Sequence, residues 1–359
     1  MISLGIVGCA HCHTPWILRV LSARPDAKVK AVYDHDRARA EVCARALGAA
    51  VVDDPATILK DPDIRGVFVL SETNRHEADV LATSRAKKSV FVEKPLGLGA
   101  KDAFKMARSL EKTGVLFMTG YRTRSEGIFN FLREHIRAGS FGKVTRIRYI
   151  TCHGSGLNGG FAPEHEWMTD PRQAGGGAFL DLGTHALDSL LWLMGEPVVE
   201  ATAVTGGALS SPSPVRGEEF GEGLLRFAGG AIGSLAASRI DIDQPVRCVI
   251  SGTKGHAHVV SGRLFFKSQV VAGADGQTPW TDLPTDRPLV FDIFVDALSD
   301  RSRNGFITAR EAANVCAVQE AMATGARLKR WVKPHLLPPV LSTPYFTDST
   351  RSTLATAGG

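Results

Sequence analysis

The chain has 359 residues, of which 44% are hydrophobic and 22% are charged, and its formal net charge is +5 at pH 7. This length exceeds what one hydrophobic core usually serves, so two domains are expected. The lysines and arginines are scattered, which argues against a nucleic-acid partner and leaves a mild attraction for anions. No apolar segment approaches the roughly 20 residues of a membrane span, and no basic leader opens the chain. We therefore expect a cytoplasmic protein without a membrane partner.

The cysteines and histidines near the N-terminus form a separate pattern. Six cysteines in the whole chain are too few for a disulfide scaffold, so reduced thiols are expected. Cys9, Cys12 and His13 spell the C-x-x-C-H pattern of c-type haem attachment, and the density of Cys and His here also fits a metal site. Covalent haem needs an exported chain, and this segment already fits another function. We predict no metal.

That other function is the opening of a dinucleotide-binding βαβ unit. A buried strand ends at Gly8 and is followed by a turn and an apolar helix. The fingerprint needs small residues at the turn, at the approach of the pyrophosphate, and where the helix meets the strand. Gly8 and Ala10 fit the first two places, whereas His13 stands at the third. Either the helix stands further off, or His13 points toward the cofactor. The predicted cofactor contacts here are Gly8, Ala10, His11 and His13.

A second strand, over residues 29–34, ends in an acid. Asp34 lies at about the distance expected for a carboxylate that takes the adenosine ribose hydroxyls, which favours NAD over NADP. Arg37 close by is the uncertainty in that preference. Asp34 also fits the N-cap of a helix over residues 36–47, and both interpretations can hold together.

The alternation of strand and helix then continues through the first 120 residues. Polar residues crowd the carboxyl end of the strand over residues 66–70, and Ser71 and His76 are predicted to contact the cofactor. This pattern argues for a parallel sheet with right-handed crossovers. We predict an α/β Rossmann domain over residues 1–120.

A hydrophobic strand within this domain ends in Glu93, Lys94 and Pro95. Pro95 cannot donate to a sheet and restricts the residue before it, so the strand stops here, and a cis bond is one option. Lys94 is then presented at the carboxyl edge of the sheet, where ligands bind in open α/β folds. Taken alone, the stretch would fit a surface salt bridge beside a turn better than a ligand site.

After residue 120 the pattern changes to strands separated by glycine turns. Gly229 and Gly230 join two such strands as a hairpin, and helices are predicted over residues 291–298 and 309–324. We predict an α+β C-terminal domain over residues 121–330, with an open antiparallel sheet that serves substrate binding and oligomerisation. A Pro-rich tail over residues 331–359 follows it.

A glycine run at residues 175–177 leads into a polar helix face. Asp181, His185 and Asp188 are spaced by four and three residues, which places them on one face of a helix. A carboxylate one turn from an imidazole can fix its tautomer and stabilise its charged form, as a general base near neutral pH requires. The alternative is a buried, satisfied histidine with Asp181 as a cap.

Together, the Rossmann opening, Glu93-Lys94-Pro95 and the stretch from Gly175 through Asp181 to His185 resemble the Gfo/Idh/MocA oxidoreductases. The resemblance implies a Rossmann domain, a C-terminal open antiparallel sheet and a nicotinamide between them. It implies that Lys94 contacts the reacting oxygen, that Asp181 binds substrate and that His185 accepts the proton. Exposed sheet faces in this family usually pair, so a homo-oligomer, either a dimer or a tetramer, is expected.

Two departures from the family pattern stand out. Ser71-Glu72-Thr73 replaces a common Thr-Pro-Asn, so cofactor contacts there are expected to differ, and Arg122-Thr123-Arg124 replaces Asn-Arg-Arg. Polar residues around the glycine run are candidate substrate contacts, with ordinary loop polarity as the alternative. The predicted substrate contacts are Arg124, His153, Asn158, His165, Trp167, Arg172 and Asp181.

These features predict an NAD-dependent dehydrogenase that oxidises a secondary hydroxyl of a sugar, cyclitol or glycoside. A neutral polyhydroxylated ring is the expected substrate, although the arginines leave an acidic sugar or a sugar phosphate open. One alternative is a glycosidase-like enzyme that retains NAD and uses transient oxidation to drive elimination. Another is a sugar-sensing regulator that has lost turnover.

Overall fold

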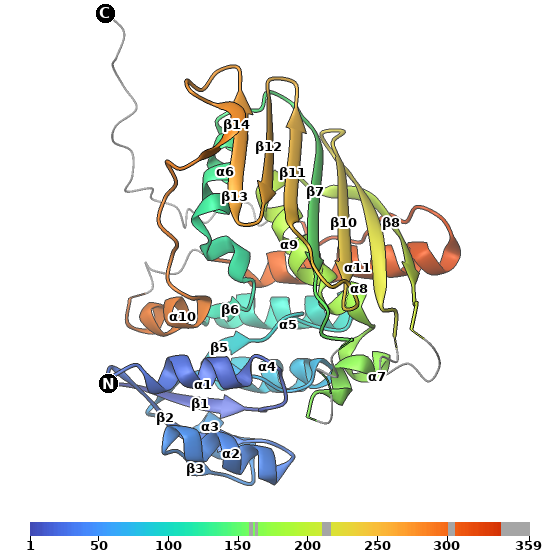
Figure 1. Ribbon diagram of the computed structural model, residues 1–359. Coiled ribbons are helices and arrows are strands. Elements are labelled where there is room, and N and C mark those ends of the chain that lie inside the picture. Colours follow the sequence, from blue (N-terminus) through green and yellow to red (C-terminus); the bar gives the residue numbers. More distant parts are fainter. Residues whose placement is uncertain (158–160, 162–163, 210–216, 301–305, 339–359) are drawn as a thin grey trace, which may run out of the picture.

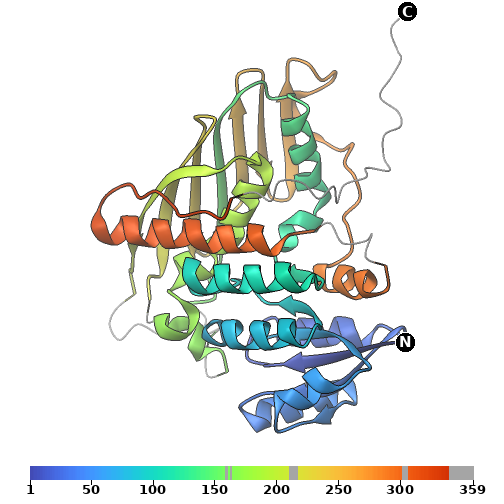
Figure 2. The same cartoon turned by 180° about the vertical axis from the view of Figure 1, so that it is seen from behind.

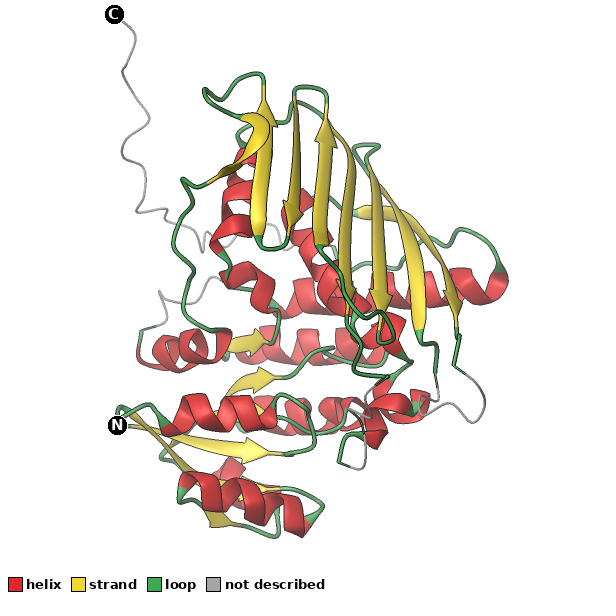
Figure 3. Cartoon of the chain, viewed as in Figure 1, coloured by secondary structure: helices red, strands yellow, loops and turns green. Residues whose placement is uncertain are grey.

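The structure, a computed structural model, describes residues 1–157, 161, 164–209, 217–300 and 306–338. Two sheets dominate it, one built from the first third of the chain and one from the remainder (Figure 1; strands in yellow in Figure 3). Among the helices of the described ranges, none is long and apolar enough to cross a membrane. Asn158 and most of the predicted tail lie outside the described residues.

The N-terminal sheet is parallel, in the order β3-β2-β1-β4-β5-β6, which confirms the predicted Rossmann domain. Its central strands are buried on both faces, as their continuous apolar sequences predict. The strands are β1 Ile2–Val7, β2 Ala27–Tyr33, β3 Ala50–Val51, β4 Ile64–Val69, β5 Ser89–Val92 and β6 Phe117–Thr119. The helices between them are α1 Thr14–Ser22, α2 Arg37–Leu47, α3 Pro55–Lys60, α4 His76–Arg85 and α5 Ala100–Thr113.

Helix α10 (Val290–Ser299) comes from much later in the chain but packs on this first sheet. Its Phe294 ring lies 5.2 Å from the ring of Phe68 in β4, and its Phe291 ring lies 4.9 Å from that of Trp16 in α1. The core of the Rossmann sheet is therefore completed by a residue range that the sequence assigned to the second domain.

The second sheet has the order β14-β13-β12-β11-β7-β10-β9-β8. Among its described strands, β7 and β10 pair in parallel and the other neighbours are antiparallel, so the predicted antiparallel sheet is mixed at that point. The Gly229-Gly230 hairpin joins β9 to β10 as predicted. The strands are β7 Val144–Cys152, β8 Val198–Gly206, β9 Phe220–Phe227, β10 Ile232–Ser238, β11 Val246–Gly252, β12 Gly255–Val260, β13 Arg263–Ser268 and β14 Asp275–Trp280.

Helices cover one face of this sheet. Exposed and buried residues alternate strictly along β9, as expected for a strand with one packed face. Helices α6 (Gly127–Arg137), α9 (Gly183–Met194) and α11 (Ala309–Leu328) lie on the packed side. Figure 2 shows α11 beside α5, so this long helix ties the two sheets together.

A buried ion pair between Arg124 and Asp188 holds α9 in place. Arg124 donates from Nη2 and Nε to the two oxygens of Asp188, at 2.6 and 3.1 Å, and from Nη1 to the Phe306 carbonyl at 2.8 Å. Both side chains are almost fully buried, and Glu311 of α11 lies 3.3 Å from Arg124 Nη1. Asp188 therefore points toward this network, although the sequence placed it on the face of His185.

Removing one partner of this pair should destabilise the fold strongly. Asp188→Ala leaves the Arg124 guanidinium buried without its main counter-charge, and we expect it to lower the free energy of unfolding by about 3 to 5 kcal/mol. Glu222→Ala is the matched control, because its pair with Arg148 is exposed on both sides and should contribute less than about 1 kcal/mol. Chemical denaturation of both variants measures the difference. Equal losses would mean that the Arg124 pair has no special role in stability.

Candidate active site

Lys94 lies at the carboxyl end of β5, directly before a cis peptide bond to Pro95. The side chain is only 2% exposed, and its Nζ donates to Oδ1 of Asp181 at 2.8 Å. Burial alone would lower the pKa of Lys94, but Asp181 and Glu93 beside it raise that pKa above its ordinary value. Lys94 is therefore a charged ammonium group that is fixed by Asp181 at the sheet edge where it was predicted.

Arg239, directly after β10, is the second cation on Asp181. Its Nη2 donates to Asp181 Oδ2 at 2.5 Å, and its Nη1 donates to the Met168 carbonyl at 3.1 Å. Burial alone would raise the pKa of Asp181, but Lys94 and Arg239 hold that pKa well below its ordinary value. The sequence analysis missed Arg239, because nothing in its local pattern joins it to an acid 58 residues earlier.

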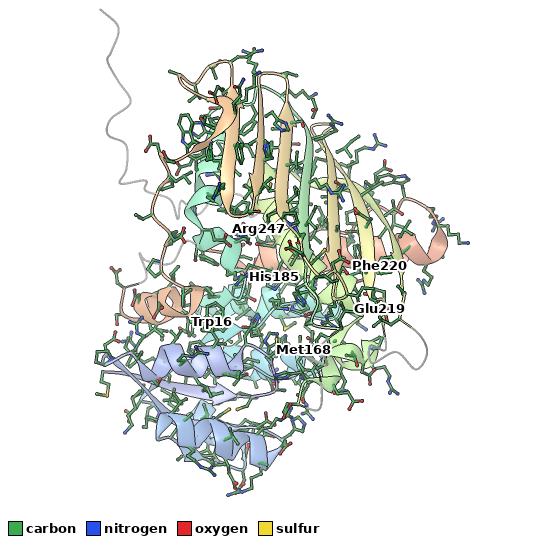
Figure 4. All side chains as sticks on the ribbon, viewed as in Figure 1. Trp16, Met168, His185, Glu219, Phe220 and Arg247 are labelled. Carbon is green, nitrogen blue, oxygen red and sulfur yellow. The ribbon has the colours of Figure 1, made fainter. Side chains whose placement is uncertain are left out.

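His185 belongs to a different helix from Asp181. Asp181 ends the short α8 (Ala178–Asp181), and α9 begins at Gly183, so the predicted single helix is broken at Leu182. In Figure 4, His185 lies between the second sheet and the Rossmann elements. Burial, and then the charge of Lys94, lower its pKa well below the ordinary value, so the ring is neutral at pH 7. Within the described residues, the Asp181 carboxylate accepts side-chain hydrogen bonds from Lys94 and Arg239 and none from His185, so the prediction that it fixes the His185 tautomer is wrong.

Glu93 connects the glycine-rich turn to Lys94. Its Oε1 lies 3.1 Å from Nδ1 of His13, and its Oε2 accepts from the main-chain N–H of Lys94 at 3.0 Å. Burial alone would raise the pKa of Glu93, but His11, His13 and Lys94 lower it below its ordinary value. Because Glu93 is a carboxylate, His13 must donate to it. His13 thus points into the site, which is one of the two outcomes that the sequence left open.

His11, His13 and Glu93 form the group of the described residues whose geometry fits a metal ion, with ligand atoms within 4.8 Å of one another. However, Nδ1 of His11 accepts from the main-chain N–H of His13 at 3.2 Å. In a neutral imidazole the other nitrogen then carries the proton, and burial lowers the pKa of His11 to about 3. His11 Nε2 therefore carries the proton and faces Glu93 Oε2 at 3.8 Å, and it has no hydrogen-bond partner among the described residues. The absence of a metal stays a prediction.

The turn after β1 has the shape that a dinucleotide needs. Gly8 has φ +79°, and a Cβ there would lie 2.4 Å from the main-chain nitrogen of Ser71. The Ala10 carbonyl accepts from Trp167 Nε1 at 3.0 Å, so Trp167 meets the cofactor turn. At the start of α1, the buried Thr14 Oγ1 has no hydrogen-bond partner in the described part of the chain. These residues fit a bound pyrophosphate, which the helix N-terminus would also favour.

Two residues predicted to contact the cofactor, Asp34 and His76, form hydrogen bonds within the protein. Asp34 is covered, because its Oδ2 accepts from the Cys9 main-chain N–H at 2.6 Å and its Oδ1 from Arg39 at 3.1 Å. Each carboxylate oxygen can accept more than one hydrogen bond, so the bond of Asp34 to the ribose hydroxyls stays a prediction, whereas the N-cap of α2 is Asp36 and not Asp34. The ring of His76 faces the carbonyls of Pro95 and Ser71, at 3.0 and 3.2 Å, so it supports the turn after Lys94 and is no cofactor contact.

The predicted substrate contacts divide in a similar way. His153 donates its main-chain N–H to Ser238, which places it next to Arg239 at the edge of the site. Arg124 is bound by Asp188 behind α9, and the 87% exposed Arg172 side chain pairs with Asp170, so neither reaches Lys94. His165 begins a short helical turn, and its Nδ1 has no hydrogen-bond partner among the residues described. The Arg124 guanidinium is therefore used by the protein's own Asp188, and the substrate-binding roles of Arg124 and Arg172 stay predictions.

A Rossmann sheet with a buried lysine at its carboxyl edge, below an open sheet, defines a nicotinamide-dependent oxidoreductase fold. Residues 2–121 match the family model of the oxidoreductase family with an NAD-binding Rossmann fold, and residues 129–258 match the GFO/IDH/MocA C-terminal domain. The chain belongs to the Gfo/Idh/MocA oxidoreductase family and binds NAD.

Similar proteins point in the same direction. The myo-inositol 2-dehydrogenase of Thermotoga maritima is 32% identical over 267 residues, which is 71% of this chain and 72% of that protein. The scyllo-inositol 2-dehydrogenase (NAD(+)) of Bacillus subtilis is 27% identical over 77% of each chain. A solved structure of levoglucosan dehydrogenase with NADH and L-sorbose superposes with a TM-score of 0.78, covering 94% of this chain and 99% of that one at 19% identity. At 19% identity, this last similarity shows a shared fold.

Proposed function

We propose that this protein is an NAD(H)-dependent dehydrogenase that oxidises a secondary hydroxyl of a neutral sugar, cyclitol or glycoside. The observation that carries the proposal is the buried Lys94–Asp181 pair at the Rossmann edge, on the same face as a neutral histidine. Relatives named as inositol dehydrogenases support the class of substrate.

His185 and Lys94 divide the work in this proposal. Bound NAD supplies the hydride acceptor. His185, neutral because burial and Lys94 disfavour its charged form, takes the hydroxyl proton as the hydride leaves the same carbon. The Lys94 ammonium, fixed by Asp181, stabilises the negative charge that develops on the oxygen. Trp167 and the loop that carries it limit access of water at the cofactor turn.

The charges of the buried site favour a neutral substrate. Lys94 and Arg239 are balanced by Asp181 and Glu93, while His11 and His185 are neutral. An anionic group would find the two buried cations of the described site, Lys94 and Arg239, already paired with Asp181, although Arg239 keeps one buried donor, Nε, unpaired within the described residues. A substrate hydroxyl can accept a hydrogen bond from such a donor without adding charge to the site. This pairing is favourable because a buried donor left unpaired costs about 1 to 3 kcal/mol.

Replacing His185 tests the proton step. His185→Ala should lower kcat by roughly 10² to 10⁴ because the general base is gone, while NAD affinity stays the same. His258→Ala, on the second sheet, is the control with the same chemical change. Steady-state rates and NAD titration measure both effects. Normal turnover by a folded His185→Ala protein would assign this histidine to packing.

The pH dependence follows from the direction of the pKa shifts. A base acts only when unprotonated, and the pKa of His185 in the folded protein lies below 6.5, so activity is lost only as the pH falls through that lower value. Lys94, whose pKa is raised above 10.5, stays charged through neutral pH. We expect kcat/KM, measured from about pH 5 to about pH 10, to be level around neutrality. An acid limb centred at or above 6.5 would contradict the assignment.

Substrate choice is tested by a screen for NADH formation. Inositols, neutral pyranoses and their glycosides should turn over, whereas uronic acids and sugar phosphates should react poorly because the buried Lys94 and Arg239 are already paired with Asp181. Lys94→Ala should abolish turnover of the best substrate without unfolding the chain. Turnover of the anionic set alone would refute the neutral pocket, and an intact rate in Lys94→Ala would refute the mechanism. Bond cleavage without net NADH would indicate the glycosidase-like alternative, and binding without any turnover the regulator.

A further inference from the structure

A cluster of charged side chains lies at the opposite end of the cofactor edge from Lys94. Glu72 follows β4 and Asp34 follows β2, and these strands flank β1 on either side in the sheet. Arg39, from the first turn of α2, reaches between them. In a doubly wound sheet this is the side toward which the adenosine half of a dinucleotide lies.

Arg39 is shared by the two carboxylates. Its Nη2 lies 3.1 Å from Asp34 Oδ1 and 2.9 Å from Glu72 Oε1. The Glu72 side chain is 6% exposed and the Arg39 side chain 24%. The Arg39 guanidinium is thus fixed by the Asp34 and Glu72 carboxylates, and both of them balance its positive charge.

The cluster also contains unused hydrogen-bonding atoms. Glu72 Oε2 and Arg39 Nε are buried and have no hydrogen-bond partner among the described residues. Their remaining neighbours are loose ion pairs, Arg75 Nε at 3.4 Å from Glu72 Oε2 and Asp36 Oδ2 at 3.7 Å from Arg39 Nε. A buried acceptor left unpaired costs about 1 to 3 kcal/mol, so Glu72 Oε2 is suited to a ligand hydroxyl.

We propose that Glu72 is a cofactor-specificity residue of this protein. Its carboxylate takes a hydroxyl of the adenosine ribose and holds Arg39 in a pair, so that no free guanidinium faces the 2′ position. NAD carries a hydroxyl there, which can donate to a carboxylate. NADP carries a phosphate that two carboxylates repel, and Arg39 is already engaged by both of them.

Glu72 is a better test position than Asp34. The Asp34 carboxylate also bonds the main-chain N–H of Cys9 in the cofactor turn, so its loss would disturb the turn itself. Glu72 has φ −61°, which proline adopts without strain, and no main-chain N–H bond is recorded for it in the described structure. Glu72→Pro therefore removes the carboxylate and keeps the backbone, and Glu72→Gln keeps the shape and removes the charge.

The experiment compares the dissociation constants of NAD and NADP for the full-length protein by calorimetric titration. In both Glu72 variants we expect the NADP/NAD preference to move toward NADP by at least about tenfold. Adding Arg39→Met to Glu72→Gln should remove this gain, because the gain depends on the released guanidinium. Glu111→Gln is the matched control, since Glu111 pairs with Arg310 and touches neither Arg39 nor Arg37.

The outcomes decide the proposal either way. An unchanged preference in folded Glu72→Gln and Glu72→Pro proteins overturns it, as does an equal shift in Glu111→Gln. If Arg39→Met leaves the gain intact, the role given to Arg39 is wrong. The readout is cofactor binding, so a negative result leaves the proposed sugar dehydrogenase activity untouched.

Discussion

The site depends on three buried charges, Lys94, Asp181 and Arg239, that come from three separate elements. Removing three charges from water is expensive, and the cost is offset only when their geometry and hydrogen bonds are good. Here each oxygen of the Asp181 carboxylate has its own cation. Because Lys94 belongs to the Rossmann sheet and Arg239 to the second sheet, the ionic bonds also fix how the two sheets meet. The catalytic ammonium is therefore positioned by the same contacts that hold the sheets together.

A second consequence follows for His185. Burial and the nearby Lys94 ammonium disfavour an imidazolium at His185, and the charge of Asp181, which favours one, does not outweigh them. The histidine is kept neutral by its surroundings, so it can accept a proton but is a weak base. Turnover would then rely on Lys94 to make the hydroxyl more acidic, which couples the two residues more closely than their separation in sequence suggests.

The sequence predicted the features that depend on local pattern. Apolar runs and glycine turns located the strands, and Pro95 identified where β5 ends and Lys94 is presented. Features that depend on direction or long-range pairing could not be predicted. The parallel β7–β10 pair joins strands about 80 residues apart, α10 fills the core of a sheet it does not follow, and Arg239 has no local motif. Arg124 shows the same limit, because its charge is paired with the protein's own Asp188, which its local sequence does not reveal.

The departures from the family pattern form pairs in the fold. His13 replaces a small residue at the turn, and it donates to Glu93, 80 residues later. Glu72 replaces a proline, and it binds Arg39, 33 residues earlier. In both cases the new polar side chain is partly or fully buried and has a partner of the complementary kind, as burial of a polar group requires. Restoring one family residue alone would remove a hydrogen-bond partner from the other member of its pair, so the two residues of each pair depend on one another. The two pairs lie at different places along the predicted cofactor edge, and neither pair includes Lys94 or His185.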